Sequence, residues 1–373
     1  MKNTLLEDAV SVQSARRRFL ANGGKLLAGS LSGSVAGSLA GSLLLSTLPM
    51  STSFAADTAA IPVPLIIDTD PGADDVIALL LALSARDRLD VKALTTVAGN
   101  VQLRYTSRNA RMVREWANRP DVPVYAGCAR PMLRTPIYAA EVHGAEGVTG
   151  VKIFEPEQPL AKGQAVQYLI ETLLAAKPQS ITIVTLGPQT NLAMALIQNP
   201  DIKQGIKEII MMGGAHFNGG NITPAAEFNV FADPHAADVV FKSGLPLTVI
   251  PLDVTHKMLT SPERIERLRK IGNQAGKIAA DILDAYVEHD IKQYGLPGGP
   301  VHDATTIGYL LKPDMFKGRM VNVEVDTREG PTFGETVVDY YHATKRPENA
   351  CWITEGDTQG FFDLLTVQLA KLP

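Results

Sequence analysis

The stretch LIIDTDPGADD (Leu65–Asp75) places four carboxylates within eight residues, between an apolar run of strand length and the apolar run Val76–Leu83. Asp side chains are rarely buried unless something pairs with them. Like charges this close repel one another, so they persist together only where a cation, protons or hydrogen-bond donors neutralise them. The stretch therefore predicts a strand that ends in an acidic site at the start of a buried helix.

Two interpretations of these carboxylates compete. Asp favours the cap and first turn of a helix, which would account for Asp74 and Asp75. Helix capping does not account for Asp68 and Asp70 on the strand side. Crowded carboxylate oxygens suit a hard cation, and calcium tolerates a flexible set of oxygen ligands. We therefore favour a metal site over helix capping.

Residues 1–55 have the composition of a secretory signal rather than of a folded domain. Arg16–Arg18 precede Phe19-Leu20, a Gly/Ser/Ala/Leu segment follows, and Ser53-Phe54-Ala55 offers small residues for cleavage. The paired arginines indicate the twin-arginine export machinery as a transient partner. The alternative is a membrane anchor, but recurrent Gly and Ser make a poor spanning helix. We expect cleavage near Ala55 and a periplasmic or secreted protein.

The remaining residues, 56–373, are predicted to form one large domain. Removing residues 1–55 takes away five Lys/Arg and two Asp/Glu, which changes the formal charge from −4 to −7. Such a charge provides no basic surface of the kind that nucleic acid requires. The chain has only two cysteines, Cys128 and Cys351, which can form a bridge in an oxidising compartment or stay as buried thiols.

Apolar runs of strand length alternate with segments of helical length, which predicts an α/β fold with a mostly parallel, Rossmann-like sheet flanked by helices. We expect strands at Pro64–Asp68, Val91–Val97, Val122–Tyr125, Ile181–Leu186, Ile206–Met212, Leu247–Leu252, Met320–Asp326 and Cys351–Thr354. We expect helices at Asp74–Ala85, Thr106–Asn118, Gln164–Ala175, Asn191–Gln198, Pro234–Lys242, within Ser261–Tyr294, after Asp303, and at Thr358–Leu372.

Polar and glycine-rich turns follow several of these strands. Asp68 and Asp70 follow the first, Gly99-Asn100 the second, and Gly187-Pro188 the strand at Ile181–Leu186. Because ligands of open α/β sheets bind beyond the carboxyl ends of the strands, these turns predict an enzyme or a small-molecule binder. Asp253, after Leu247–Leu252, is interpreted as a structural turn residue.

Six ordered motifs carry a family resemblance over residues 62–373. They are Asp68–Asp75, Thr96–Asn100 (TVAGN), Leu186–Ala193 (LGPQTNLA), Met212–Gly214, Asn221–Asn229 (NITPAAEFN) and Val301–Asp303. Together they resemble the inosine–uridine-preferring nucleoside hydrolases, calcium enzymes that cleave the N-glycosidic bond of ribonucleosides. The resemblance implies the nucleoside hydrolase fold, a ribonucleoside substrate, Ca²⁺ and a homodimer or homotetramer.

The resemblance also assigns roles to individual residues. It implies that Asp70, Asp75 and Asp303 bind calcium through carboxylates and Leu186 through its backbone carbonyl. Asp70 would take a proton from the calcium-bound water that attacks the sugar. Further residues would hold the ribose: Asp74, Asn100, Met212, Asn221, Glu227 and Asn229.

Two histidines are candidates for contact with the base. His302, beside Asp303, is the candidate general acid for the leaving base, because imidazole donates a proton near neutral pH. His143 lies in His143–Gly147, where the resemblance predicts a His-Gly-x-Asp-Gly turn, but Glu146 replaces the aspartate. That replacement leaves the geometry of the turn open. The alternatives are a helix-flanking role for His302 and an ordinary loop histidine at position 143.

Two rival functions follow from the same residues. A haloacid-dehalogenase-type phosphatase also opens with a strand and a DxD, but Pro71-Gly72 and the pair Asp74-Asp75 do not match its continuation. An exported, non-catalytic ribonucleoside-binding protein would need the sugar contacts without a water-activating aspartate. The preference for purine or pyrimidine bases stays open at this stage.

Overall fold

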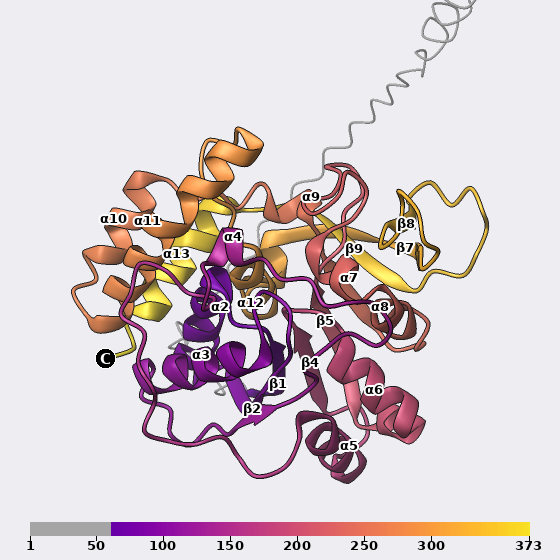
Figure 1. Cartoon of the computed structure of the whole chain (residues 1–373), viewed down its shortest axis with the longest axis horizontal. Coiled ribbons are helices and arrows are strands. Elements are labelled where there is room, and N and C mark those ends of the chain that lie inside the picture. Colours follow the sequence, from indigo (N-terminus) through magenta and orange to yellow (C-terminus); the bar gives the residue numbers. More distant parts are fainter. Residues whose placement is uncertain (1–60) are drawn as a thin grey trace, which may run out of the picture. The chain divides into compact units, whose positions relative to one another are not determined.

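The computed structural model describes residues 61–373, apart from the side chains at 288–290 and 293–294. A nine-stranded sheet with the order β3-β2-β1-β4-β5-β6-β9-β7-β8 forms its centre (Figure 1). Seven neighbouring strands run parallel in the order β3-β2-β1-β4-β5-β6-β9. Strand β7 is antiparallel to both of its neighbours, β9 and β8. The strands are β1 (Val63–Thr69), β2 (Leu89–Thr96), β3 (Val124–Ala126), β4 (Ile181–Thr185), β5 (Ile206–Met212), β6 (Leu247–Ile250), β7 (Phe316–Val325), β8 (Thr336–Asp339) and β9 (Ala350–Gly356).

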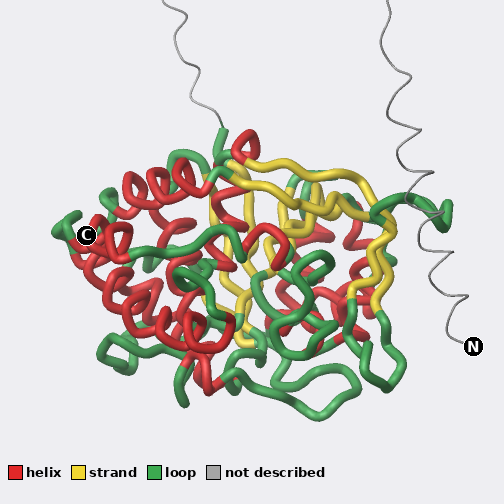
Figure 2. The backbone as a smooth tube through the Cα atoms, turned by 90° about the horizontal axis from the view of Figure 1, so that it is seen from above, coloured by secondary structure: helices red, strands yellow, loops and turns green. Residues whose placement is uncertain are grey.

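Helices cover both faces of the sheet, and Figure 2 shows the strands between them. The longer helices are α2 (Ala73–Ser84), α3 (Leu103–Trp116), α5 (Ala165–Ala175), α6 (Thr190–Gln198), α8 (Pro234–Phe241), α10 (Pro262–Arg269), α11 (Gln274–Tyr294), α12 (His302–Leu311) and α13 (Thr358–Leu369). Shorter helical segments are α4 (Ala140–His143), α7 (Phe228–Ala232) and α9 (Leu252–Thr255). The fold is thus the predicted single α/β domain with a mostly parallel sheet flanked by helices.

Alternate residues of the central strands serve two separate cores. Leu65 and Ile67 of β1 pack into the core that contains α2, α11, α12 and α13, whereas Ile66 packs into the core that contains α5, α6 and α8. Side chains of a strand point alternately to the two faces of a sheet, so a continuous apolar run belongs on a strand covered on both sides.

Helix α2 lies inside the first core, and all twelve of its residues are buried. A helix that is apolar around its whole circumference belongs in such a position. Its first turn nevertheless carries Asp74 and Asp75, so two carboxylates are carried into the interior at the end of β1. The fold therefore places an acidic turn where solvent does not screen it.

The structure corrects several predicted boundaries. The strand predicted at Leu247–Leu252 ends at Ile250, because Pro251 begins the short helix α9. The strand predicted at Met320–Asp326 is the second half of the longer β7. Sequence patterns did not reveal β8, α4 or α7, which span only four, four and five residues.

Two further predictions concern residues 1–55 and the two cysteines. The predicted signal peptide at residues 1–55 lies outside the described residues. No helix of the part described, from residue 61 on, is long and apolar enough to cross a membrane. Cys128 and Cys351 are free, partly buried thiols. Burial, with the nearby charges of Asp68 and Asp233, raises the pKa of Cys128 to about 12, so it is not a reactive thiolate.

Asp253 follows β6 and acts as a structural acceptor, as predicted. Its Oδ1 accepts hydrogen bonds from the backbone N–H groups of Phe217 (2.7 Å) and Asn218 (2.9 Å). Its Oδ2 accepts one from the indole Nε1 of Trp352 (2.8 Å), which is fully buried in β9. A single carboxylate therefore joins the loop after β5 to the sheet.

We expect Asp253→Ala to lower the free energy of unfolding by about 3 kcal/mol, because it leaves the buried Trp352 indole N–H and two partly buried backbone N–H groups without an acceptor. The measurement is the urea midpoint at constant m-value. Asp90→Ala is the control: it removes a half-exposed partner of Lys92 and should change stability by less than about 1 kcal/mol. Equal effects of the two changes would contradict the role given to Asp253.

Candidate metal centre and ligand pocket

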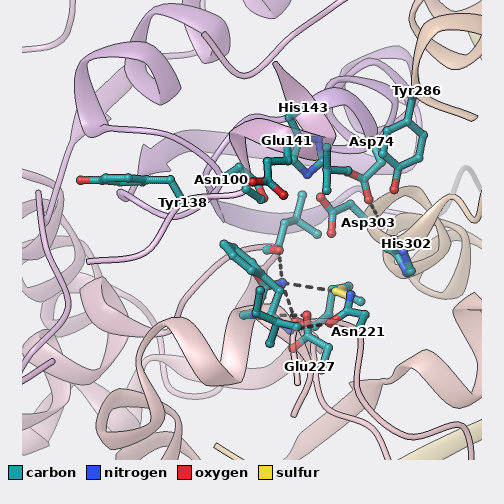
Figure 3. Close-up of a pocket in the computed structure, with 17 residues that line it drawn as sticks. Asp74, Asn100, Tyr138, Glu141, His143, Asn221, Glu227, Tyr286, His302 and Asp303 are labelled. Atoms are coloured by element: carbon teal, nitrogen blue, oxygen red, sulfur yellow. Dashed lines mark hydrogen bonds between the residues drawn. The ribbon is translucent and has the colours of Figure 1, made fainter. Parts of the chain in front are cut away.

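A pocket opens at the edge of the sheet where β1, β2, β4 and β5 end, as the strand-end turns predicted (Figure 3). Several predicted site residues line it: Asp74, Asn100, His143, Leu186, Met212, Asn221, Glu227, Asn229, His302 and Asp303. Asp70 and Asp75 lie beneath them and are fully buried. The structure thus brings all of the predicted site residues to one place.

Asp75 organises the turn between β1 and α2. Its Oδ1 accepts hydrogen bonds from the Thr69 hydroxyl (2.5 Å) and from the Asp70 N–H (3.3 Å). Its Oδ2 accepts from the Gly72 N–H (2.9 Å) and from the Asn100 amide (3.1 Å). The helix-capping interpretation is therefore correct for Asp75, which closes the first turn of α2 in addition to any ligand it binds.

Asp70 is held in a cradle that leaves one of its oxygens without a partner. Its Oδ2 accepts a hydrogen bond from the Asn100 N–H (2.6 Å), whereas its buried Oδ1 has no hydrogen-bond partner. A Cβ on Gly99 would lie 2.0 Å from Oδ2, and a Cβ on Gly187 would lie 2.2 Å from Oδ1. Only glycine at both positions leaves room for this carboxylate.

Three further carboxylates gather next to Asp70. Asp74, Asp75 and Asp303 each offer an oxygen, and these oxygens lie within 4.8 Å of one another. The Asp303 N–H also donates to Asp74 Oδ2 (3.3 Å). The group whose oxygens can contact a common ion thus consists of Asp74, Asp75 and Asp303: it includes Asp74, which the resemblance assigned to the sugar, and does not include Asp70.

The electrostatics of this cluster favour a bound cation. Burial raises the pKa of Asp303 well above its usual range, and the charges of Asp74, Asp75 and Asp70 raise it further. Burial likewise raises the pKa of Asp70, with the charge of Asp75 as the next cause. Buried like charges without a counter-charge are costly, and a divalent cation would restore the ionised forms. The orphaned Asp70 Oδ1 and these carboxylates fit such an ion.

Leu186, whose backbone carbonyl the resemblance predicts as a calcium ligand, lines the pocket. That oxygen accepts a hydrogen bond from the Asn229 amide nitrogen (2.7 Å) and keeps a second lone pair. The same amide nitrogen lies 3.3 Å from the sulfur of Met212. Asn229 therefore links two strand ends and leaves its amide oxygen as the group that can accept from a ligand.

Glu227 is the N-cap of α7 as well as a pocket residue. Its carboxylate accepts from the backbone N–H groups of Asn229 (2.8 Å) and Val230 (3.1 Å) and also of Gly214 (3.0 Å). Burial raises its pKa to about 7 despite these bonds. The Asn221 side-chain oxygen accepts from the Phe228 N–H (2.9 Å). Both residues are thus fixed in place near the carboxyl end of β5.

His143, Tyr286 and His302 line the pocket from α4, α11 and the start of α12 (Figure 3). The rings of His143 and Tyr286 stack with centroids 5.7 Å apart. His302 Nδ1 lies 2.8 Å from the Thr255 hydroxyl. Burial lowers the pKa of His302 well below its usual range, and the neighbouring His256 and His143 lower it further. The imidazole of His302 is therefore neutral at pH 7.

The side chain of Glu146, which is longer than the aspartate that the resemblance predicts at this position, contacts α3. Its carboxylate forms an ion pair with Arg108 (2.6 Å), and its backbone oxygen accepts from the Asn109 amide (2.8 Å). The same Asn109 amide donates to the Pro71 carbonyl (3.0 Å), next to Asp70. The loop with glutamate in place of aspartate is thus anchored to the helix that also supports the acidic motif.

Sequence reasoning missed several residues that the structure places here. Tyr138, Glu141 and Phe228 line the pocket, and Asn109 and Thr255 support its residues from outside. Glu141 could have been found from the sequence, because it lies two residues before His143, which was itself a predicted site residue. His256, which belongs to none of the six motifs, lies beside His302 with ring centroids 5.6 Å apart.

The chain matches known proteins over this whole domain. The family model of the inosine-uridine preferring nucleoside hydrolases matches residues 65–363. A pyrimidine-specific ribonucleoside hydrolase of Salmonella gallinarum is 45% identical over 307 residues, 82% of this chain and 98% of the relative. An uncharacterised protein of Schizosaccharomyces pombe is 44% identical over 309 residues, 83% of this chain and 99% of its own.

Solved structures show the same architecture. A purine-preferring ribonucleoside hydrolase from Gardnerella vaginalis superimposes with a TM-score of 0.76 at 30% identity, over 82% of this chain and 98% of that one. The plant nucleoside hydrolase PpNRh1 superimposes with a TM-score of 0.78 at 31% identity, over 83% and 99% of the two chains.

We expect calcium chloride to raise the melting temperature of the chelator-treated protein, because an ion bound only by the folded cluster stabilises it by mass action. The gain is about 2.7 kcal/mol at a calcium concentration one hundred times the dissociation constant. Thermal unfolding followed by circular dichroism measures it. Asp303→Asn should abolish the shift, whereas Asp90→Asn, a change at a half-exposed surface carboxylate, should retain it. A full calcium shift in Asp303→Asn would contradict the metal centre.

Proposed function

The chain belongs to the inosine-uridine preferring nucleoside hydrolase family, and from this premise we propose that Asp70, Asp75 and Asp303 hold the calcium ion of its active site. The protein hydrolyses the N-glycosidic bond of ribonucleosides to free base and ribose. The observation that supports the metal assignment most directly is the buried Asp70 Oδ1, which is cradled by two glycines and has no partner.

The ligand set we propose consists of oxygens only: the carboxylates of Asp70, Asp75 and Asp303 and the carbonyl of Leu186. Such a set matches the oxygen preference of calcium, and substrate hydroxyls and water would complete its 6–8 ligands. When bound, the ion supplies a Lewis acid that lowers the pKa of a water molecule at the site.

Asp70 is the group we assign as general base. As a carboxylate beside the bound ion, it takes the proton from the attacking water. The water oxygen then forms a bond to the anomeric carbon as the bond from that carbon to the base breaks. The carboxylates around the site stabilise the positive charge that develops on the sugar.

The sugar contacts come from the polar side of the pocket. We assign Asp74 and Asn229 to the 2′- and 3′-hydroxyls, and Asn221 and Glu227 to the 5′ end, while Asn100 and Met212 line the ribose site. Support comes from the rigidity of this side, where these side chains are hydrogen-bonded to backbone groups or to one another. Contacts of this kind hold the sugar at the distance and angle that the reaction needs.

His302 assists departure of the base, with His143 as a second contact. Because His302 is neutral, it carries one N–H, and its Nδ1 is hydrogen-bonded to the Thr255 hydroxyl, which can donate to this nitrogen. With the hydroxyl donating to Nδ1, the proton resides on Nε2, which can donate a hydrogen bond to the leaving base. This hydrogen bond stabilises the negative charge that develops on the base, and the base takes its proton from water after it departs, because a neutral imidazole is too weak an acid to give up its own.

Pyrimidine ribonucleosides are the substrates we propose. The chain is 45% identical to a relative named for pyrimidine specificity, against 30% to the solved purine-preferring enzyme. We further propose that residues 1–55 direct export through the twin-arginine machinery and that the exported enzyme is a homodimer or homotetramer. The basic residues Arg16–Arg18 and the small residues before Ala55 support the export proposal.

Asp70→Asn should lower kcat for uridine and cytidine by about 10²–10⁴-fold, because the amide cannot accept the proton of water. Release of free base is measured by chromatography and release of ribose by a reducing-sugar assay, each with and without chelator. Chelation should abolish the activity of the unmodified enzyme. An Asp70→Asn enzyme with more than a tenth of normal kcat would contradict the mechanism.

His302→Ala should lower kcat far more for uridine than for p-nitrophenyl riboside. The nitrophenolate leaving group carries negative charge without help, whereas the pyrimidine anion depends on the hydrogen bond from His302. We expect a loss of about 10²-fold or more for uridine and a loss at least ten times smaller for the aryl riboside. Equal losses for the two substrates would assign His302 a purely structural role.

A further inference from the structure

The pocket has two chemically different sides. The side that faces the metal centre is polar and includes Asp74, Asn100 and Asn229. The other side, formed by α4 and α11, includes the apolar Val142 and the aromatic Tyr286. A ribose with its hydroxyls belongs on the first side and a flat base on the second. Glu141 also lines the pocket, on the short helix α4 that carries His143 (Figure 3).

Glu141 differs from every other carboxylate of the pocket. Asp74, Glu227 and Asp303 are buried, whereas Glu141 is exposed to the opening. Glu227 accepts three backbone hydrogen bonds, but within residues 61–373 no group donates to the Glu141 carboxylate or forms an ion pair with it. Its acceptor capacity is therefore available to a ligand that enters the pocket.

The backbone that carries Glu141 is fixed relative to the reaction centre. The short helix α4 starts after Ala139, whose N–H donates to the Asn100 carbonyl (2.9 Å). At its other end, His143 Nδ1 accepts from the Ala73 N–H at the start of α2 (3.1 Å). Glu141 lies between these two anchors. A side chain carried on an anchored segment discriminates between ligands better than one on a mobile loop, because less conformational entropy is lost on binding.

His143 and Glu141 can form hydrogen bonds with different groups of a base. Because His143 Nδ1 accepts from the Ala73 N–H, its proton resides on Nε2, which can donate to the 2-carbonyl oxygen of a pyrimidine. Cytosine and uracil share that oxygen. They differ at position 4, where cytosine carries an amino donor and uracil a carbonyl acceptor. A carboxylate only accepts, so it attracts the first group and repels the second.

We propose that Glu141 selects bases that carry an amino group, so that the enzyme prefers cytidine to uridine. Position 4 lies opposite the glycosidic nitrogen in the ring and therefore points away from the sugar, toward the opening where Glu141 is exposed. The inference rests on the proposed function and adds to it the feature of the base that is recognised.

The test compares kcat/KM for cytidine and uridine in the unmodified enzyme, in Glu141→Gln and in Glu141→Ala. We expect the unmodified enzyme to favour cytidine. Glu141→Gln should lower kcat/KM for cytidine and raise it for uridine, because the amide can donate to the 4-carbonyl. The cytidine-to-uridine ratio should fall about tenfold, which corresponds to about 1.4 kcal/mol. Glu141→Ala should also lower the ratio, with a smaller rise for uridine than in Glu141→Gln, because alanine removes the repulsion without adding a donor.

Adenosine and inosine provide an independent pair, because they differ in the same way at position 6. Their ratio should shift in the same direction. Glu157→Gln, which makes the same change in charge at an exposed position outside the pocket, should leave both ratios unaltered. An unchanged cytidine-to-uridine ratio in both Glu141 variants, or an equal loss for the two substrates, would overturn the inference. Absence of base release from any nucleoside would instead overturn the proposed function.

Discussion

The burial of four aspartates at one strand end is the constraint on which the rest of this structure depends. Asp70, Asp74, Asp75 and Asp303 are each at most 4% exposed, and in the absence of a cation their mutual repulsion and desolvation raise the pKa values of Asp70 and Asp303. A fold keeps such a cluster only if stronger interactions hold its backbone in place. Here the cluster stands at the start of a helix whose twelve residues are all buried.

Backbone groups provide that support. Asp75 accepts from the turn that precedes it, and Asn100 presents both its N–H to Asp70 and its side-chain amide to Asp75. Gly99 and Gly187 allow two neighbouring turns to approach the Asp70 carboxylate so closely that no side chain fits between them. The position of the Asp70 carboxylate is therefore determined by the ends of three adjacent strands, β1, β2 and β4. Such a site is preorganised, which is the condition for electrostatic stabilisation of a transition state.

The parts of this arrangement that sequence alone could predict are those with long or dense patterns. The apolar runs around Leu65 and Ile206 predicted buried parallel strands, and the acidic motif predicted a site at their ends. Patterns of four or five residues carry no periodicity, so β8 and the helix that bears Glu141 were not predicted. Contacts between distant segments were also inaccessible, such as the ion pair of Glu146 with Arg108. The neutral state of His302 required knowledge of its burial and of its histidine neighbours.

The neutrality of His302 has a consequence for how the two halves of the pocket divide the reaction. The aspartates concentrate negative charge beneath the sugar, which favours a cationic sugar in the transition state. A protonated imidazole nearby would oppose that charge, whereas a neutral imidazole donates to the base without adding a positive charge at the anomeric carbon. The environment of His302 maintains this state: it is enclosed, and the neighbouring rings of His256 and His143 disfavour a further proton. The two sides of the pocket are thus electrostatically complementary to the two fragments into which the nucleoside separates, a sugar that becomes positive and a base that becomes negative.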